Sequence, residues 1–382
     1  MTVWDALAGS RAADGLAAQV SSGAPAQAWL LAGPPGSGKR QAAVAIAAAF
    51  NCSLEPGRGC GRCPACARIL RGRHPDVHHI VPEGPLIPVD VIREAIIPEA
   101  ARSPFEAPYK VFIVEEAERM NPNAQNALLK TLEEPQPDTI FVLTTESEDE
   151  LLDTVRSRCR MFRLDPVPES RIIELLEAEG VEGSQARLAA RVAEGDYARA
   201  RSLALDAEVS RRREMWLGLP MRLGAPSDVL DMAQEVLDAV REAVARRLEG
   251  QKQEVAELAD AMGEGRGTAG ARNSLAKRHR RELRRLEIEV LGEAFGTLGS
   301  LWRDLLVTRR GSPEAITNLD RLDELRSLAD TAPRDADLVA AMERCGAARS
   351  ALERNANAQL LVEATLLDLG RLIPTPPAKA LT

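Results

Sequence analysis

The sequence lacks any long apolar run without charges. No window approaches the about 18 uncharged apolar residues that a transmembrane helix needs, so we expect none. The first residues carry Asp5 and Asp14 and have no apolar core, which argues against a secretory signal peptide. These absences predict a cytoplasmic protein, in which cysteines are thiols or metal ligands rather than disulfides.

Aromatic residues and net positive charge are scarce as well. Aromatics make up 3% of the 382 residues, and the formal net charge is −8. An acidic balance argues against a protein that binds DNA or membranes over its whole surface. Hydrophobic residues make up 45% of the chain, enough for the cores of about two to three domains. The abundance of Ala, Leu, Arg and Glu favours helices.

Short apolar runs alternate with helical patterns over residues 1–165. The runs are rich in Val, Ile and Phe, which is typical of buried parallel strands, and lie at 28–32, 77–81, 110–114 and 139–144. The helical patterns between them lie at 39–50, 89–101 and 123–134. This alternation predicts a doubly wound α/β domain with a parallel sheet.

The turn Asp165-Pro166-Val167-Pro168 ends this pattern. Residues 166–206 predict a small helical domain, residues 207–373 an all-α domain, and residues 374–382 a disordered tail. In the all-α domain, an apolar stripe predicts an amphipathic helix with Ser227 as its N-cap: Val229, Val236, Val240, Val244 and Leu248. The glycine-rich stretch 263–270 predicts a mobile loop.

A candidate phosphate loop follows the first predicted strand and opens a helix. It reads Gly-Pro-Pro-Gly-Ser-Gly-Lys, from Gly33 to Lys39. Gly33, Gly36 and Gly38 would let backbone N–H groups converge on phosphate oxygens. Lys39 would reach the outer phosphates, and the helix N-terminus adds a partial positive charge. The alternative is a chance glycine turn.

Two positions that would hold Mg²⁺ depart from the pattern. Arg40 stands where a Ser or Thr hydroxyl is required, and a guanidinium cannot ligate a metal. The third strand is followed by Glu115, where an Asp would organise the ion, while Glu116 retains the position of a water-activating base. Binding of ATP or ADP is left open at this degenerate site, and hydrolysis is not expected.

Four cysteines lie close together in the spacing C-x7-C-x2-C-x2-C: Cys52, Cys60, Cys63 and Cys66. Four thiolates can enclose one Zn²⁺ tetrahedrally and leave no position for water, so we predict a structural zinc site. Redox-active cysteines and unligated buried thiols are the alternatives. The nearby histidines are expected to be surface or packing residues: His74, His78 and His79.

Several segments resemble the clamp-loader branch of the AAA+ ATPases in bacterial DNA polymerase III, and most of all its delta-prime members. They are Val3–Gly9, Ala28–Gly33, the Asn-Ala-Leu-Leu-Lys-Thr-Leu-Glu-Glu run within Gln125–Pro135, and Ser157-Arg158-Cys159. The resemblance covers about residues 1–205. It implies a hetero-oligomeric subunit of the DNA polymerase III holoenzyme with an AAA+ domain, a lid and a collar. Such a subunit works with motor and clamp-opening subunits, a sliding clamp and primed DNA.

The resemblance also implies a role for Arg158. In this family the Ser-Arg-Cys arginine points across a subunit interface at the γ-phosphate bound by a neighbour. Arg158 would then act in trans, where a guanidinium offers charge and paired hydrogen bonds to the transferring group. Thr145 matches a phosphate-sensing position, and Ala198 stands where motor subunits carry a lid arginine, although the adjacent Arg199 could substitute.

Two interpretations follow from the resemblance: a non-motor subunit that supplies Arg158, and an active ATP-hydrolysing motor subunit. A stand-alone P-loop kinase is disfavoured, because the long helical region shows no substrate site. DNA contact is left open for a basic run without interleaved aromatics: Lys277, Arg278, Arg280, Arg281, Arg284 and Arg285.

Overall fold

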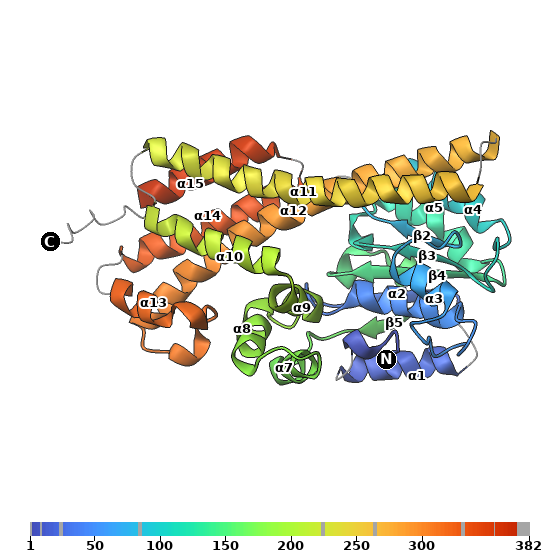
Figure 1. Cartoon of the computed structure of the whole chain (residues 1–382). Helices are drawn as coiled ribbons and strands as arrows, with labels where there is room; N and C mark the ends of the chain where they lie inside the picture. Colours follow the sequence, from blue (N-terminus) through green and yellow to red (C-terminus); the bar gives the residue numbers. More distant parts are fainter. Residues whose placement is uncertain are drawn as a thin grey trace. The chain divides into compact units, whose positions relative to one another are not determined.

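The structure, a computed structural model, describes residues 2–7, 10–22, 26–82, 86–222, 226–262, 266–329, 333–354 and 356–372. The chain divides into two compact units, residues 1–206 and 207–382 (Figure 1). Within the described residues, no helix is long and apolar enough to cross a membrane.

A five-stranded parallel sheet lies at the centre of the first unit. Its order is β2-β3-β4-β1-β5. The strands are β1 (Ala28–Ala32), β2 (Val77–Ile80), β3 (Lys110–Val114), β4 (Thr139–Thr145) and β5 (Arg160–Arg163). Every residue of β1, β3 and β4 is buried, as expected for strands covered on both faces.

Helices cover both faces of this sheet. One face carries η1 (Asp5–Leu7), α1 (Arg11–Ser21), α2 (Lys39–Phe50) and α3 (Pro64–Leu70). The other face carries η2 (Val91–Ile96), α4 (Ile97–Ala100), α5 (Pro122–Glu133) and α6 (Asp153–Arg156), with η3 (Ala117–Arg119) and η4 (Glu148–Glu150) in the connections. Trp29 and Leu31 pack on the first face and Leu30 on the second, because alternate residues of a strand point to opposite faces.

Three short helices complete the first unit: α7 (Glu169–Ala178), α8 (Gly183–Ala193) and α9 (Tyr197–Leu205). Gly195, between α8 and α9, packs against the segment that follows β5. Its φ is +95°, and a Cβ there would lie 2.3 Å from the Pro166 Cβ, so only glycine fits. The Val167 N–H donates to the Gly195 carbonyl at 3.0 Å, which fixes the three helices on the sheet domain.

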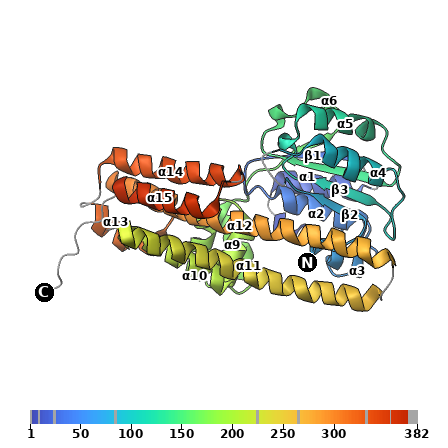
Figure 2. The same ribbon diagram turned by 90° about the horizontal axis from the view of Figure 1, so that it is seen from above.

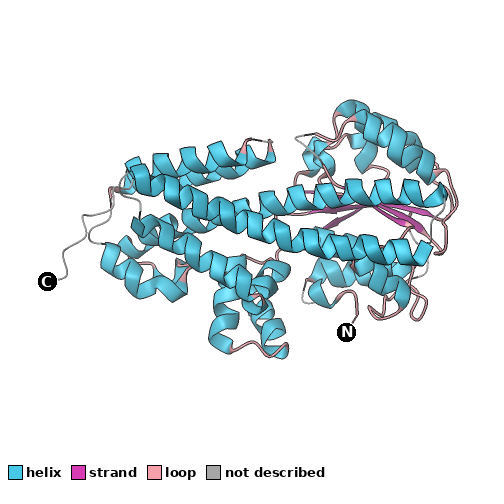
Figure 3. Ribbon diagram, turned by 45° about the horizontal axis from the view of Figure 1, so that its top comes forward, coloured by secondary structure: helices cyan, strands magenta, loops and turns pink. Residues whose placement is uncertain are grey.

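The second unit is helical throughout its described residues, and the strands lie in the first unit (Figure 3). Its elements are α10 (Ala207–Gly218), η5 (Leu219–Arg222), α11 (Pro226–Met262), α12 (Arg266–Arg309), η6 (Pro313–Ala315), η7 (Leu319–Arg321), α13 (Leu322–Ala329), α14 (Asp335–Glu353) and α15 (Ala358–Leu372). Helices α11, α12, α14 and α15 pack against one another around an apolar core (Figure 2). The fold class predicted from the sequence is confirmed.

A buried carboxylate anchors the connection after α12. Asp304 is fully buried and accepts hydrogen bonds from the backbone N–H groups of Thr317 (3.0 Å) and Asn318 (2.7 Å). The Asn318 amide also accepts from Arg213 of α10 at 2.7 Å. This polar network fixes the connection against α10 and α12, because each buried charge has bonded partners.

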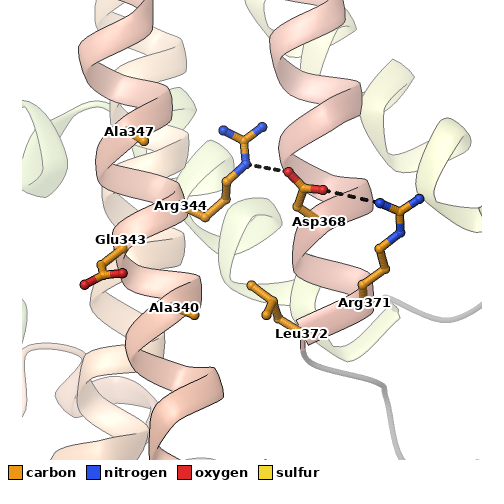
Figure 4. A pocket seen from close by; sticks show the side chains of 7 residues that line it. All are labelled: Ala340, Glu343, Arg344, Ala347, Asp368, Arg371 and Leu372. Atoms are coloured by element: carbon orange, nitrogen blue, oxygen red, sulfur yellow. Dashed lines mark ion pairs between the residues drawn. The ribbon is translucent and has the colours of Figure 1, made fainter.

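The shallow pocket in Figure 4 lies between α14 and α15. Asp368 bridges two arginines there, at 2.8 Å from Arg344 Nε and 3.6 Å from Arg371 Nη1. None of the predicted site residues lines it. We assign it no function, because such exposed ion pairs are common on helical surfaces.

Several details predicted for the second unit are wrong. Leu248 is 42% exposed, and the apolar core takes in Val244 of the same helix but not Leu248. Helix α11 begins at Pro226, so Ser227 lies within the first turn and is not the N-cap. Helix α12 begins at Arg266, so residues 266–270 are helical. Residues 263–265 and the predicted tail 374–382 lie outside the described residues.

Asp76 fixes the loop that precedes β3. Its buried carboxylate accepts the backbone N–H groups of Phe105 (2.5 Å), Glu106 (2.9 Å) and Ala107 (2.9 Å). Burial raises the pKa of Asp76, but these three donors outweigh it and hold the pKa below its ordinary value. The carboxylate therefore stabilises the fold above the unfolded-state pKa, and this contribution is lost as the pH falls through the lower folded-state pKa.

We expect Asp76→Asn to destabilise the chain by about 2–3 kcal/mol at pH 7, since an amide replaces one accepting oxygen by a donor facing N–H groups. Urea denaturation measures this difference, which should shrink below about pH 4, where the Asp76 carboxyl of the unfolded wild type gains a proton before that of the folded state. A difference that stays constant down to pH 3 would contradict the charged-acceptor role.

Candidate functional site

The phosphate loop connects the end of β1 to the start of α2. Gly36 and Gly38 both have φ near +78°, a left-handed conformation that favours glycine. A Cβ on Gly33 would lie 2.2 Å from the Leu164 carbonyl oxygen. Gly38 is the N-cap of α2 and makes no side-chain cap bond, so the helix start retains free N–H donors toward the loop. The backbone therefore has the form of an anion-binding loop.

Lys39 is bound by the loop itself. Its ammonium donates to the carbonyl oxygens of Gly33 (2.6 Å) and Pro34 (2.8 Å). Burial lowers the pKa of Lys39, while nearby carboxylates oppose that shift: Glu146, Glu118, Glu116 and Asp196. The lysine charge thus sits among acidic groups and already has hydrogen-bond partners.

The two departures from the metal-binding pattern contact each other. Arg40 Nε lies 3.2 Å from Glu115 Oε1, and the side chains are 52% and 4% exposed. His79 Nδ1 lies 3.8 Å from the same oxygen. The Arg40 guanidinium therefore replaces the hydroxyl that would bind Mg²⁺, and it pairs with the carboxylate that would organise the ion. The residues present do not fit that ion.

The remaining predicted nucleotide-site residues lie nearby but are engaged with protein groups. Glu116 has φ +52° and pairs with Arg119 Nε at 2.8 Å. The Thr145 hydroxyl donates to the Ser147 carbonyl at 2.9 Å and accepts the Ser147 N–H at 3.2 Å. The structure thus brings the predicted positions together around the loop. Nucleotide binding at this loop stays a prediction.

The start of α9 also reaches the loop, which the sequence pattern did not reveal. A Cβ on Gly36 would lie 3.0 Å from the Asp196 Cβ. Asp196 caps α9 by accepting the Arg199 N–H at 3.1 Å. The positions that the sequence indicated on this helix were Ala198 and Arg199, where motor subunits carry a lid arginine that contacts nucleotide. The signal that could have indicated Asp196 is its position after Gly195, where an Asp is a strong helix cap.

The four cysteines converge in the segment between α2 and α3. Their sulfur atoms all lie within 4.8 Å of one another, and none of the side chains is more than 3% exposed. Cys52 and Cys63 Sγ are 3.9 Å apart, so they are not disulfide-bonded. A tetrahedral zinc with Zn–S bonds of about 2.3 Å needs sulfurs about 3.8 Å apart. The cluster therefore fits a zinc ion.

Backbone donors surround these sulfurs. The N–H groups of Glu55 (3.2 Å) and Cys60 (3.3 Å) point to Cys52 Sγ, and that of Cys66 points to Cys63 Sγ at 3.4 Å. Burial raises the pKa of Cys63, but hydrogen bonds, that of the Cys66 N–H first, outweigh it and bring the pKa to about 5. Such donors stabilise thiolates, which is the form that ligates metal.

Arg158 lies between α6 and β5. Its Nη1 donates to the Thr154 carbonyl at 2.7 Å, and its Nη2 pairs with Glu133 at the end of α5. About a third of its side chain is exposed. The guanidinium is therefore held at the surface by two helices of its own unit.

Sheet register separates Arg158 from the chain's own phosphate loop. Strands β1 and β5 run parallel with Trp29 opposite Arg160 and Ala32 opposite Arg163. Arg158 thus lies at the edge where β1 begins, whereas the loop follows the end of β1. At about 3.3 Å per residue the two are about 15–20 Å apart, which exceeds the reach of an arginine side chain.

The basic run lies on α12. Arg284 pairs with Glu287 at 2.5 Å and Arg285 with Glu289 at 2.9 Å, and Arg280 is exposed. The side chains of Lys277, Arg278 and Arg281 lie outside the described residues. Neighbouring carboxylates therefore neutralise part of the run, and contact with DNA stays untested.

Comparison with known proteins identifies relatives of the first unit. Residues 9–168 match the sequence model of a family described as DNA polymerase III, delta subunit. The DNA polymerase III subunit delta' of Bacillus subtilis is 38% identical over 165 residues, which cover 43% of this chain and 50% of the relative. The subunit tau of the same bacterium is 36% identical over 190 residues, 48% of this chain and 33% of the relative. The chain spans half or less of the length of these two relatives.

Among solved structures, a DNA polymerase III gamma subunit-related protein from Thermotoga maritima aligns with 94% of this chain and 99% of its own, at 18% identity and a TM-score of 0.42. Through residues 9–168, the chain is similar in sequence to the DNA polymerase III delta subunit family and to the delta' subunits.

Proposed function

We propose that the chain is a non-motor subunit of the DNA polymerase III clamp loader and supplies Arg158 to the ATP site of a neighbouring subunit. The position of Arg158 carries this proposal. It lies at the sheet edge opposite its own phosphate loop, as the register of β1 and β5 requires. A surface guanidinium there can serve only a nucleotide held by another chain.

The non-motor part is supported by the ion pair between Arg40 and Glu115 at 3.2 Å. Phosphoryl transfer needs a divalent metal to position the phosphates and neutralise their charge. Both positions that would hold this metal are occupied by groups that bind each other. A nucleotide that reached this loop would therefore not be hydrolysed.

The proposed partners are the motor and clamp-opening subunits of the complex, the sliding clamp, and primed DNA reached through the complex. These partners follow from the resemblance to the clamp-loader family, and the chain spans half or less of the length of the two relatives described above. The setting would be the cytoplasm. A structural zinc held by Cys52, Cys60, Cys63 and Cys66 would stabilise the segment between α2 and α3.

An active motor subunit is the second candidate. It is favoured by the similarity to subunit tau and by the retained Lys39 and Glu116. Two contacts argue against a motor subunit. The Lys39 ammonium donates hydrogen bonds to carbonyl oxygens of its own loop, and Glu116 pairs with Arg119.

ATP turnover by the isolated chain decides between the two. We expect a rate no higher than that of Lys39→Ala, because the metal that supports phosphoryl transfer has no ligand set. Phosphate release from ATP with Mg²⁺ is the measurement. Turnover that Lys39→Ala abolishes would establish the motor interpretation instead.

A further inference from the structure

Arg40 and Glu115 form an ion pair beside the phosphate loop. Arg40 is the second residue of α2, and Glu115 directly follows β3. Nε and Oε1 are 3.2 Å apart, and the carboxylate is nearly buried at 4% exposure. A buried carboxylate without a cation is costly, so Arg40 supplies the charge that Glu115 needs in this fold.

The rest of the loop is intact. Gly36 and Gly38 have positive φ angles, and Gly33 lies too close to the Leu164 carbonyl for a Cβ, as an anion-binding loop requires. Lys39 is present, and the start of α2 has no side-chain cap. What differs from a metal-dependent nucleotide site is therefore confined to the pair of residues that contact each other.

The charge around the loop shows why this pair matters. Four carboxylates act on Lys39: Glu146, Glu118, Glu116 and Asp196. A nucleotide polyphosphate entering without a divalent cation would meet these negative charges, while Lys39 is bonded to loop carbonyls and Arg40 is paired with Glu115. A divalent ion would overcome the repulsion, but Arg40 stands where it would bind.

We propose that the Arg40–Glu115 ion pair takes the place of the divalent metal and is the specificity determinant that keeps Mg²⁺-nucleotides out of this loop. The ligand class excluded is a nucleoside di- or triphosphate with its Mg²⁺. Removing the pair and restoring a hydroxyl and a shorter carboxylate converts the loop to Mg²⁺-dependent nucleotide binding. This inference deepens the non-motor part of the proposed function and is independent of Arg158 and of the complex.

The test uses the full chain and ADP, with melting temperature and direct calorimetric binding as readouts. Wild type should melt within about 1 °C of its ADP-free value, with or without added Mg²⁺ and in the absence of chelator. The double variant Arg40→Ser, Glu115→Asp should gain about 5–10 °C from ADP at about 100 times its Kd when Mg²⁺ is present. Its affinity for ADP should fall about tenfold or more when Mg²⁺ is left out of a chelator-free buffer.

Two matched variants complete the test. Glu115→Gln removes the carboxylate charge but keeps Arg40, and it should gain no Mg²⁺-dependent binding. Arg102→Ser removes an exposed arginine that pairs with Glu99 at 3.1 Å, away from the loop, and it should behave as wild type. Arg40→Ser alone replaces the double variant if the latter melts early without ligand.

Wild type that binds Mg²⁺-ADP as tightly as the double variant overturns the inference. So does a folded double variant with no Mg²⁺-dependent binding. Either result leaves the role of Arg158 intact, because that role is measured as turnover of an assembled complex.

Discussion

Replacing Cys66 with Ser is expected to release the zinc and lower the melting temperature of the first unit by about 10 °C or more. Cys66 is fully buried, and its thiol lies 3.6 Å from the Ala48 carbonyl of α2. Structural zinc contributes about 10 kcal/mol or more to small domains that fold only around it. Here the apolar core that includes Ile46 and Ile69 remains after the loss. We therefore expect a loss of about 3–5 kcal/mol rather than global unfolding.

Metal analysis of protein purified without chelator should give one zinc per wild-type chain and none for the variant. Cys345→Ser is the matched control. That thiol is also buried, at 2% exposure, but it lies in the second unit among apolar side chains, and its variant should keep the zinc. Wild-type protein without zinc and with four freely reactive thiols would refute the metal assignment. Reversible oxidation of the same cysteines would favour a redox role.

The sheet was predictable from sequence because its central strands are buried on both faces. The runs at 28–32 and 110–114 have the observed bounds of β1 and β3, and those at 77–81 and 139–144 differ from β2 and β4 by one residue. Strand β5 escaped detection because it is short, begins and ends with an exposed arginine, and has no apolar run. Its pairing with β1 depends on tertiary contacts, which periodicity does not encode.

In the candidate site, too, local motifs were predictable from the sequence and contacts between distant residues were not. Motif spacing placed the phosphate loop and grouped the four cysteines, since both depend on residues close together in the sequence. The contacts of Arg40 with Glu115 and of Arg158 with Glu133 join residues distant in sequence. Sequence reasoning treated Arg40 and Glu115 as two independent defects. Their distance of 3.2 Å shows that one side chain accommodates the other.

Arg158→Ala is expected to lower ATP turnover by the assembled complex while leaving this subunit folded. Arg158 is partly exposed, and its ion pair with Glu133 is a surface contact worth about 0–1 kcal/mol, so the melting temperature should barely change. An arginine supplied in trans contributes about 10³–10⁵ to the rate at the site that it contacts. If, as proposed, Arg158 serves one ATP site of a complex that has several, total turnover should fall by the share of that site without vanishing.

Arg156→Ala is the matched control, since Arg156 lies two residues earlier and pairs with Asp149 and Asp153 of its own chain. It should leave turnover unchanged.

Arg158→Lys should restore part of the rate at most, because an ammonium lacks the planar two-point grip of a guanidinium on the transferring phosphoryl group. The loss should appear mainly in the maximal rate and little in the affinity for ATP, since the contact strengthens in the transition state. The measurement requires a reconstituted complex with sliding clamp and primed DNA. Complexes with Arg158→Ala that assemble, hydrolyse ATP and load clamps at the wild-type rate would reduce this subunit to a scaffold.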